Sequence, residues 1–140
     1  MRLKKSLSVL LCFLVLSLSS CKLEDDRLNF RFIPLQIVSA ELPNSFELNE
    51  TYQIYVTYIR PSACVVYDGF DITDAGRTTR NVVAIGSEFY DEPCTQAIEE
   101  IETFFNFIVL YDEPYFFRFW TGLDENGNDQ YLEIEVPVNP

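Results

Sequence analysis

The sequence predicts an all-β domain, an antiparallel β-sandwich of about seven strands that follows a cleavable leader. From Pro34 onward, apolar and polar residues alternate with a period of two in short runs, which is typical of strands with one buried face. Turn residues separate these runs at intervals of about 8–12 residues, as in sandwiches. Residues 21–140, which remain once the leader is removed, suffice for one domain with one core.

The leader occupies residues 1–20. Three basic residues stand within its first five positions, and an apolar run of 12 residues follows from Leu7 to Leu18. A membrane-spanning helix needs about 20 apolar residues, so this run is too short to be one. A basic start and a short apolar run are typical of a secretory signal peptide, which is removed from the mature protein.

The signal peptide ends at Leu18-Ser19-Ser20-Cys21, which resembles the bacterial lipobox: an aliphatic residue, two small residues and a cysteine. The resemblance implies lipid transfer to the thiol of Cys21, cleavage before it, and acylation of the new amino terminus by a chain such as palmitate. Several acyl chains, at about 0.8 kcal/mol per buried methylene, would hold the domain on a lipid bilayer. The alternative is an ordinary signal peptide whose first mature residue happens to be cysteine.

Residues 21–33 are expected to form an acidic tether. Glu24, Asp25 and Asp26 resemble the acidic patch that directs lipoproteins of Bacteroidetes-type bacteria to the cell surface, although Leu23 displaces the acids by one position. The resemblance implies a lipid-anchored protein of the outer membrane that faces outward. Two alternatives are a tether that is merely polar, and retention on the inner leaflet of the outer membrane.

The domain itself is expected over residues 34–140. Its predicted strands are 35–40, 51–59, 64–70, 80–90, about 100–109, 115–121 and 130–138. Residues 96–102 could also open a helix, but the aromatic and β-branched residues that follow favour a strand. Asn126-Gly127 is a hairpin turn signal between the last two strands.

The strand spacing resembles that of immunoglobulin- and fibronectin-type domains. Cys64 and Cys94 depart from the antibody pattern, because no tryptophan lies between them and Trp120 follows both. The ending "FRFWTGLDENGNDQYLEIEVPV" is similar to that of a group of small Bacteroidetes-type lipoproteins. This resemblance implies a fold and a location, and no activity.

Charge excludes one class of partner. Three of the ten basic residues and none of the 22 acidic residues lie in the leader, so the mature chain carries a formal net charge of −15. Nucleic acid is therefore excluded as a partner, because binding to phosphates requires a basic surface. The acidic surface of an exported domain is expected to serve solubility.

The cysteines predict one disulfide. Cys12 leaves with the leader and Cys21 is acylated, so Cys64 and Cys94 remain, and an exported pair is expected to be oxidised. A zinc site is the alternative, but the chain has no histidine, and two thiols cannot complete a tetrahedral zinc shell.

Two acidic motifs are candidates for calcium, which binds carboxylate oxygens. Asp124, Asn126 and Asn128 resemble the start of an EF-hand loop, but Asp129 stands where that loop requires glycine. The sequence YDEP occurs at 90–93 and again at 111–114, and the two copies could share an ion if they met. We expect ordinary turns at all three places, no metal and no cofactor.

Catalysis is not expected. A Ser-His-Asp arrangement is impossible without histidine, and no glycine-rich phosphate loop is present. Only carboxylate chemistry survives as an enzymatic alternative.

The aromatic residues point to binding. Residues 103–109 and 115–121 are apolar on both faces, so Phe104, Phe116 and Trp120 fall outside a two-layer core unless another segment covers them. Left exposed, they would suit a sugar ring or a partner protein. We therefore expect a noncatalytic module that binds an envelope protein or a glycan. The alternative is a structural envelope protein that supports a larger membrane complex without a ligand of its own.

Overall fold

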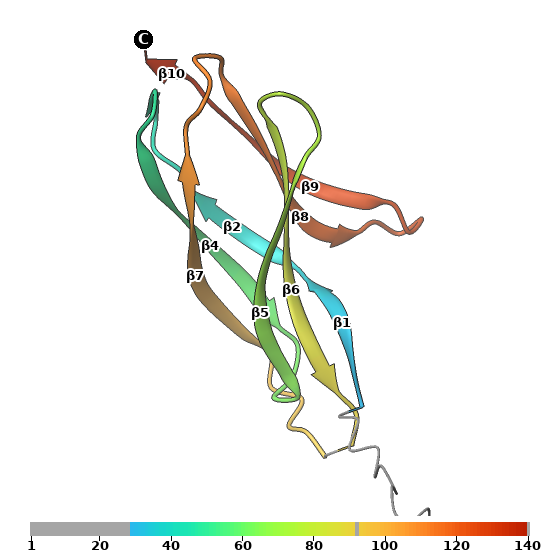
Figure 1. Cartoon of the computed structure of the whole chain (residues 1–140). Coiled ribbons are helices and arrows are strands. Elements are labelled where there is room, and N and C mark those ends of the chain that lie inside the picture. Colours follow the sequence, from blue (N-terminus) through green and yellow to red (C-terminus); the bar gives the residue numbers. More distant parts are fainter. Residues whose placement is uncertain (1–28, 92, 140) are drawn as a thin grey trace, which may run out of the picture.

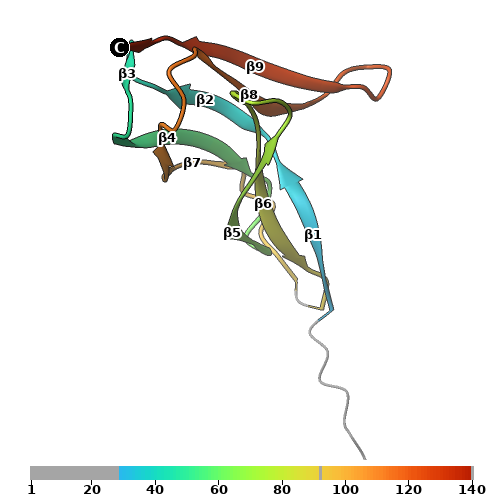
Figure 2. The same cartoon turned by 45° about the horizontal axis from the view of Figure 1, so that its top comes forward.

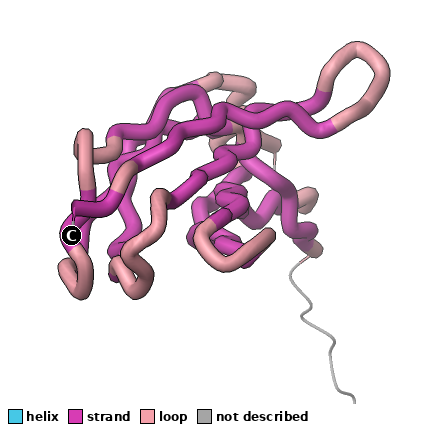
Figure 3. The backbone as a smooth tube through the Cα atoms, turned by 90° about the horizontal axis from the view of Figure 1, so that it is seen from above, coloured by secondary structure: helices cyan, strands magenta, loops and turns pink. Residues whose placement is uncertain are grey.

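The computed structural model describes residues 29–91 and 93–139, and strands are its only regular elements (Figures 1 and 3). This confirms the all-β class and the strand assignment of residues 99–108. The strands are β1 (Phe30–Leu35), β2 (Ile37–Glu41), β3 (Phe46–Glu47), β4 (Thr51–Arg60), β5 (Val65–Asp74), β6 (Thr79–Phe89), β7 (Glu99–Ile108), β8 (Tyr115–Leu123), β9 (Asp129–Val136) and β10 (Val138–Asn139). None of the described residues belongs to a helix that could cross a membrane.

The strands form two main sheets that share one core. In the first sheet β6 is central: β5 pairs along one edge, β1 and β8 pair along the other, and β9 follows β8. The second sheet has the order β2-β4-β7, and β3 and β10 form a short separate pair. The chain passes from the first sheet to the second at Gln36, which alone separates β1 from β2 (Figure 2).

The prediction of a purely antiparallel arrangement is wrong at two places. β6 and β8 pair in parallel through Thr79–Val82 and Phe116–Phe119, and the short β3–β10 pair is also parallel. Parallel neighbours need a crossover connection. Here β7 supplies it: the chain leaves the end of β6, returns through the second sheet, and enters β8 running in the same direction as β6.

The described residues contain ten strands where the sequence predicts about seven. The three additional elements are β1, which takes only Leu35 from the predicted run 35–40, and β3 and β10, which have two residues each. β1 begins at Phe30, inside the segment predicted as tether.

The core lies between the inward faces of the two sheets. Alternation places Ile54, Val56 and Tyr58 of β4 inside, and the remaining buried apolar residues follow the same rule. The core comprises Leu35, Ile37, Phe46, Ile54, Val56, Tyr58, Val65, Val82, Ala84, Phe105, Phe107, Val109, Tyr115, Phe117, Phe119 and Val136. Many of these are aromatic, and the ring of Phe107 meets those of Tyr115 and Phe117 edge-to-face, as aromatic pairs prefer.

Tyr115 fixes the connection from β7 to β8. Its side chain is fully buried at the start of β8, and its hydroxyl accepts hydrogen bonds from the backbone N–H groups of Leu110 and Tyr111, each at 3.1 Å. The guanidinium of Arg80 lies over the Tyr115 ring, 5.5 Å from its centroid. The turn that carries the chain between the sheets is therefore tied to a core side chain.

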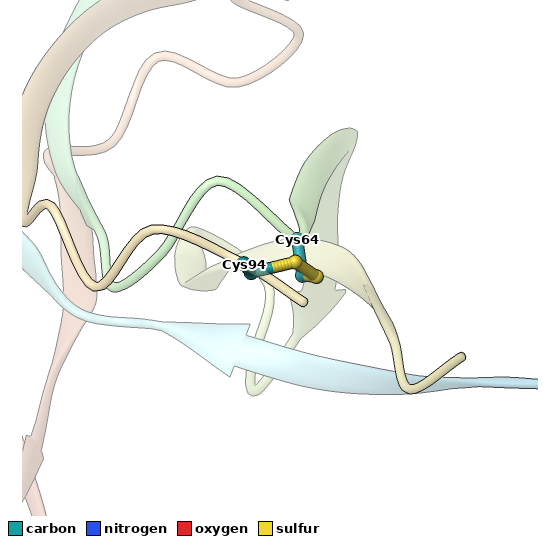
Figure 4. Close-up of a disulfide and its surroundings, with 2 residues drawn as sticks. All are labelled: Cys64 and Cys94. Atoms are coloured by element: carbon teal, nitrogen blue, oxygen red, sulfur yellow. A yellow bond between two sulfur atoms is a disulfide. The ribbon is translucent and has the colours of Figure 1, made fainter. Parts of the chain in front are cut away.

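The predicted disulfide is present. Figure 4 shows Cys64 bonded to Cys94, with 5.5 Å between their Cα atoms. Cys64 precedes β5 of the first sheet, and Cys94 lies on the segment from β6 to β7, which crosses to the second sheet. A backbone hydrogen bond of 3.0 Å from the N–H of Ala63 to the carbonyl of Thr95 runs beside the bridge.

Candidate functional site

The candidate site is the outward surface of the β8–β9 hairpin. We name this surface the β8–β9 face and define it by Phe116, Arg118 and Trp120 of β8 together with Tyr131, Glu133 and Glu135 of β9. The register pairs them across the strands as Phe116 with Glu135, Arg118 with Glu133, and Trp120 with Tyr131. Side chains that lie directly opposite each other on one face of a sheet are in contact range, so the six residues form one continuous surface.

Arg118 occupies the middle of the β8–β9 face. Its Nε donates to Oε1 of Glu133 at 2.9 Å, and its guanidinium lies over the ring of Tyr131, 4.2 Å from the centroid. Its Nη1 also reaches Oδ1 of Asn81 on β6 at 3.5 Å. These contacts hold a partly exposed cation in one position between two aromatic residues of β8.

The two aromatic residues beside Arg118 differ in exposure. Phe116 is 44% exposed, while Trp120 is half-buried and its indole N–H donates to Oδ1 of Asp129 at 2.8 Å. Phe116 is therefore an exposed ring, and Trp120 is accessible only in part. The polar group of the indole has a partner, so its apolar ring is the part left for an external contact.

A hollow of about 470 Å³ lies on the same surface. It is lined by Thr79, Phe116, Phe117, Arg118, Glu133, Ile134 and Glu135. It combines one exposed aromatic ring, one cation and two carboxylates. The hollow therefore offers apolar contact area together with polar groups that can fix the orientation of a bound group.

The hairpin that carries the β8–β9 face extends beyond the body of the domain (Figures 1, 2 and 3). Beyond Phe119, β8 pairs only with β9 among the described strands. A partner can therefore reach this arm without displacing any other described strand.

The tip of the hairpin is organised by Asp124. Its Oδ1 accepts hydrogen bonds of 2.8 Å from the backbone N–H groups of Asn126 and Asn128, and the Asn128 side-chain amide donates to Oδ2 at 3.0 Å. The hydrogen bonds from Asn128 lower the pKa of the Asp124 carboxyl below its ordinary value of 3.8. The calcium candidates Asp124, Asn126 and Asn128 thus form an ordinary turn, in which N–H groups satisfy the carboxylate.

Phe104 does not belong to the β8–β9 face. It lies on β7 in the second sheet, 45% exposed, with its ring centroid 5.7 Å from that of Tyr55 on β4. Phe116 and Trp120 lie on the outward face of the first sheet. The three predicted binding residues therefore divide into two separate surfaces.

The two YDEP motifs do not meet. Asp91 lies where β6 ends and accepts a hydrogen bond of 3.1 Å from the side chain of Asn29. Glu113 lies at the other end of β6, where it pairs with Arg77 at 3.2 Å. Among the described residues, no group of three or more His, Cys, Asp or Glu side chains is arranged to hold a metal ion.

Sequence reasoning missed Arg118, Tyr131 and Glu133. Only their placement opposite one another, in the register of the hairpin, makes them part of a site. The lipidation candidate Cys21 lies outside the described residues.

Comparisons of the chain with models of protein families, with curated proteins and with solved structures found no match.

Proposed function

We propose that this protein is an outer-membrane lipoprotein, displayed on the cell surface, whose domain is a noncatalytic module that binds a protein or a glycan through the β8–β9 face. One observation carries the proposal: Phe116 and Trp120 lie on the β8–β9 face on either side of Arg118, which is held by Glu133 and Tyr131. The acylated Cys21 would supply attachment to the bilayer.

The chemistry of this surface suits recognition. An aromatic ring offers a flat apolar area for the face of a sugar or for an apolar side chain, and aromatic residues and arginine are enriched in interfaces. Arg118 and the carboxylates of Glu133 and Glu135 offer a donor and acceptors for hydroxyl groups. No covalent step is required of any of these groups.

We further propose that the domain is immunoglobulin-like. The Tyr115 hydroxyl, which bonds back to the backbone before β8, resembles the tyrosine corner of such domains and supports this proposal. The strand order of the first sheet departs from the usual order of immunoglobulin domains, because β6 lies between β5 and β8.

A structural role without a ligand is the second candidate, and a specific observation favours it. The indole N–H of Trp120 and the guanidinium of Arg118 already have partners within the hairpin, Asp129 and Glu133. In this role both groups are satisfied within the hairpin, and the aromatic residues serve to stiffen it.

The experiment uses Phe116→Ala and, as a matched control, Phe104→Ala. The two residues are of one type and of nearly equal exposure, but they lie on different sheets. Each lipidated full-length variant is cross-linked in its native membranes, gently solubilised and purified, and its partners are identified. A glycan-binding screen follows for the same proteins.

We expect the wild type and Phe104→Ala to retain a stoichiometric partner or a glycan signal that Phe116→Ala loses. Equal retention by all three would refute the β8–β9 face as the binding site. Absence of any partner or glycan would favour the structural role. Cys21→Ala tests the anchor separately, because a variant that still incorporates palmitate would refute lipidation at Cys21.

A further inference from the structure

A second apolar surface lies at the end of the domain where the described chain begins. We name it the tether-end patch and define it by Phe30 and Phe32 of β1, Val66 of β5 and Phe89 of β6. Phe30 is 43% exposed, Phe32 67% and Val66 54%. The ring centroid of Phe30 lies 5.3 Å from that of Phe32 and 5.7 Å from that of Phe89, so the three rings form one group.

The register places all four residues on the outward face of the first sheet. Phe30 pairs with Phe89, while Phe32 and Val66 pair with Ser87 from opposite sides. The patch continues into a hollow of about 310 Å³ lined by Asn29, Ala63, Cys64, Val66, Phe89, Asp91 and Cys94. The disulfide borders this hollow and joins the segments that frame it.

Residue types common at membrane interfaces also lie on the opposite face of these strand ends, because Arg31 and Glu88 alternate with the patch residues of β1 and β6. Arg31 lies over the ring of exposed Tyr90 at 5.3 Å and pairs with Glu88 at 2.7 Å. Aromatic and arginine side chains place an apolar body in lipid and a polar end in water. Because Glu88 neutralises Arg31, and Asp68 and Asp91 lie nearby, attraction to anionic lipid cannot be the main source of binding.

The short chain between Cys21 and the patch indicates that the patch is covered by the lipid bilayer. Seven residues, 22–28, separate Cys21 from Asn29. At about 3.3–3.6 Å per residue, even a fully extended chain keeps Asn29 within roughly 30 Å of the lipidated cysteine. Asn29 itself lines the hollow beside the patch, and its carbonyl accepts a hydrogen bond from Tyr90 N–H at 3.0 Å. The apolar end of the domain is therefore the end that must stay near the bilayer.

We infer that the tether-end patch docks on the lipid bilayer, with the rings of Phe30 and Phe32 inserted at the level of the headgroups. This rests on the proposed lipid anchor at Cys21 and adds an orientation to it. An anchor at Cys21 would keep the patch close to the bilayer and so lower the cost of its association. In this orientation the end of β6 that carries Phe89 faces the bilayer, and the β8–β9 face remains in water.

The experiment uses the single tryptophan of the chain. In the background Trp120→Phe, the variant Phe32→Trp puts the only tryptophan in the patch, and Phe104→Trp is the matched control on the second sheet. Val66→Trp repeats the test on a neighbouring strand in case one replacement disturbs the fold, and circular dichroism verifies each variant. The lipidated full-length proteins are reconstituted into phosphatidylcholine vesicles whose acyl chains carry a bromine quencher.

We expect tryptophan at position 32 or 66 to be quenched several-fold more than tryptophan at 104 or the native Trp120, with little dependence on salt. Equal quenching at all positions, in protein that floats with the vesicles, would overturn the docking and leave the anchor intact. Protein that does not float would overturn the anchor and the docking with it. Cross-linked dimers joined through position 32, without quenching, would assign the patch to a second copy and also overturn the inference.

Discussion

The hydroxyl of Tyr115 gives the sharpest test of how the two sheets are connected. Tyr115→Phe removes one oxygen atom and leaves the ring, its packing and its contact with Arg80 in place. The backbone N–H groups of Leu110 and Tyr111 then lose their common acceptor.

The magnitude follows from those two donors. A buried donor left without a partner costs about 1–3 kcal/mol. Leu110 is exposed and Tyr111 half-buried, so water can reach both N–H groups in part. We therefore expect the free energy of unfolding to fall by about 1–2 kcal/mol in total. For a domain of about 100 residues this corresponds to a Tm lower by roughly 4–16 °C.

The assay is urea unfolding of wild type, Tyr115→Phe and Tyr55→Phe, followed by circular dichroism. Tyr55 is the control because its hydroxyl donates to Gln53 at 3.0 Å on the surface of the second sheet, where water replaces the lost partner. We expect Tyr55→Phe to remain within about 0.5 kcal/mol of wild type. If Tyr115→Phe were equally stable, the hydroxyl would not fix the turn, and the support it lends to an immunoglobulin-like fold would be lost.

Three further predictions concern the disulfide, a glycine and the hairpin tip. Replacing Cys64 and Cys94 together by alanine opens a loop of sequence separation 30 and should lower the free energy of unfolding by about 3–4 kcal/mol, measured by urea unfolding; an unchanged stability would contradict this. Gly86→Ala should cost about 1–3 kcal/mol in the same assay, because the added Cβ would lie 2.9 Å from the carbonyl oxygen of Val66; a neutral result would show that β5 can move aside. Folding lowers the pKa of Asp124 below 3.8, so its carboxylate supports the hairpin tip above that pH, and the support is lost as pH falls through the depressed pKa. Amide NMR signals from the tip should therefore shift with a midpoint below pH 3.8, and a midpoint above pH 3.8 would refute the turn.

Strand positions were predictable because burial on one face leaves a period of two in the sequence. β9 illustrates this: Leu132 and Ile134 pack against the core, while Glu133 and Glu135 are exposed, as their alternation predicts. The disulfide was predictable for a different reason, since only two cysteines remain once the leader and the lipidation candidate are set aside.

Sheet membership was not predictable, because alternation says which way a residue points and not which sheet holds it. Leu35 and Ile37 are both buried and keep the period of two, although the chain changes sheets between them. In the same way, Phe104 and Phe116 belong to similar aromatic strands but point outward from different sheets. These arrangements depend on contacts between strands far apart in sequence.

The candidate site was predictable only in its aromatic residues. Counting back from the hairpin loop without interruption would pair Arg118 with Ile134, an inward-facing residue. The structure has a register shift between Trp120 and Gly122, where Gly122 adopts a φ of 116°, and this shift brings Arg118 opposite Glu133. A bulge inserts one residue into one strand only, and its position is not evident from the alternation alone.

The pairing of β1 with β6 determines how the domain bears a mechanical load. The six residues of β1 pair with β6 in continuous register, from Phe30 with Phe89 to Leu35 with Ala84. A pull on Asn29 directed along β1 and away from the body acts at right angles to these hydrogen bonds and strains all of them together. Such a shear geometry resists force better than one in which bonds open in succession. A pull on the β8–β9 hairpin against a fixed Asn29 would thus be opposed by the whole ladder at once.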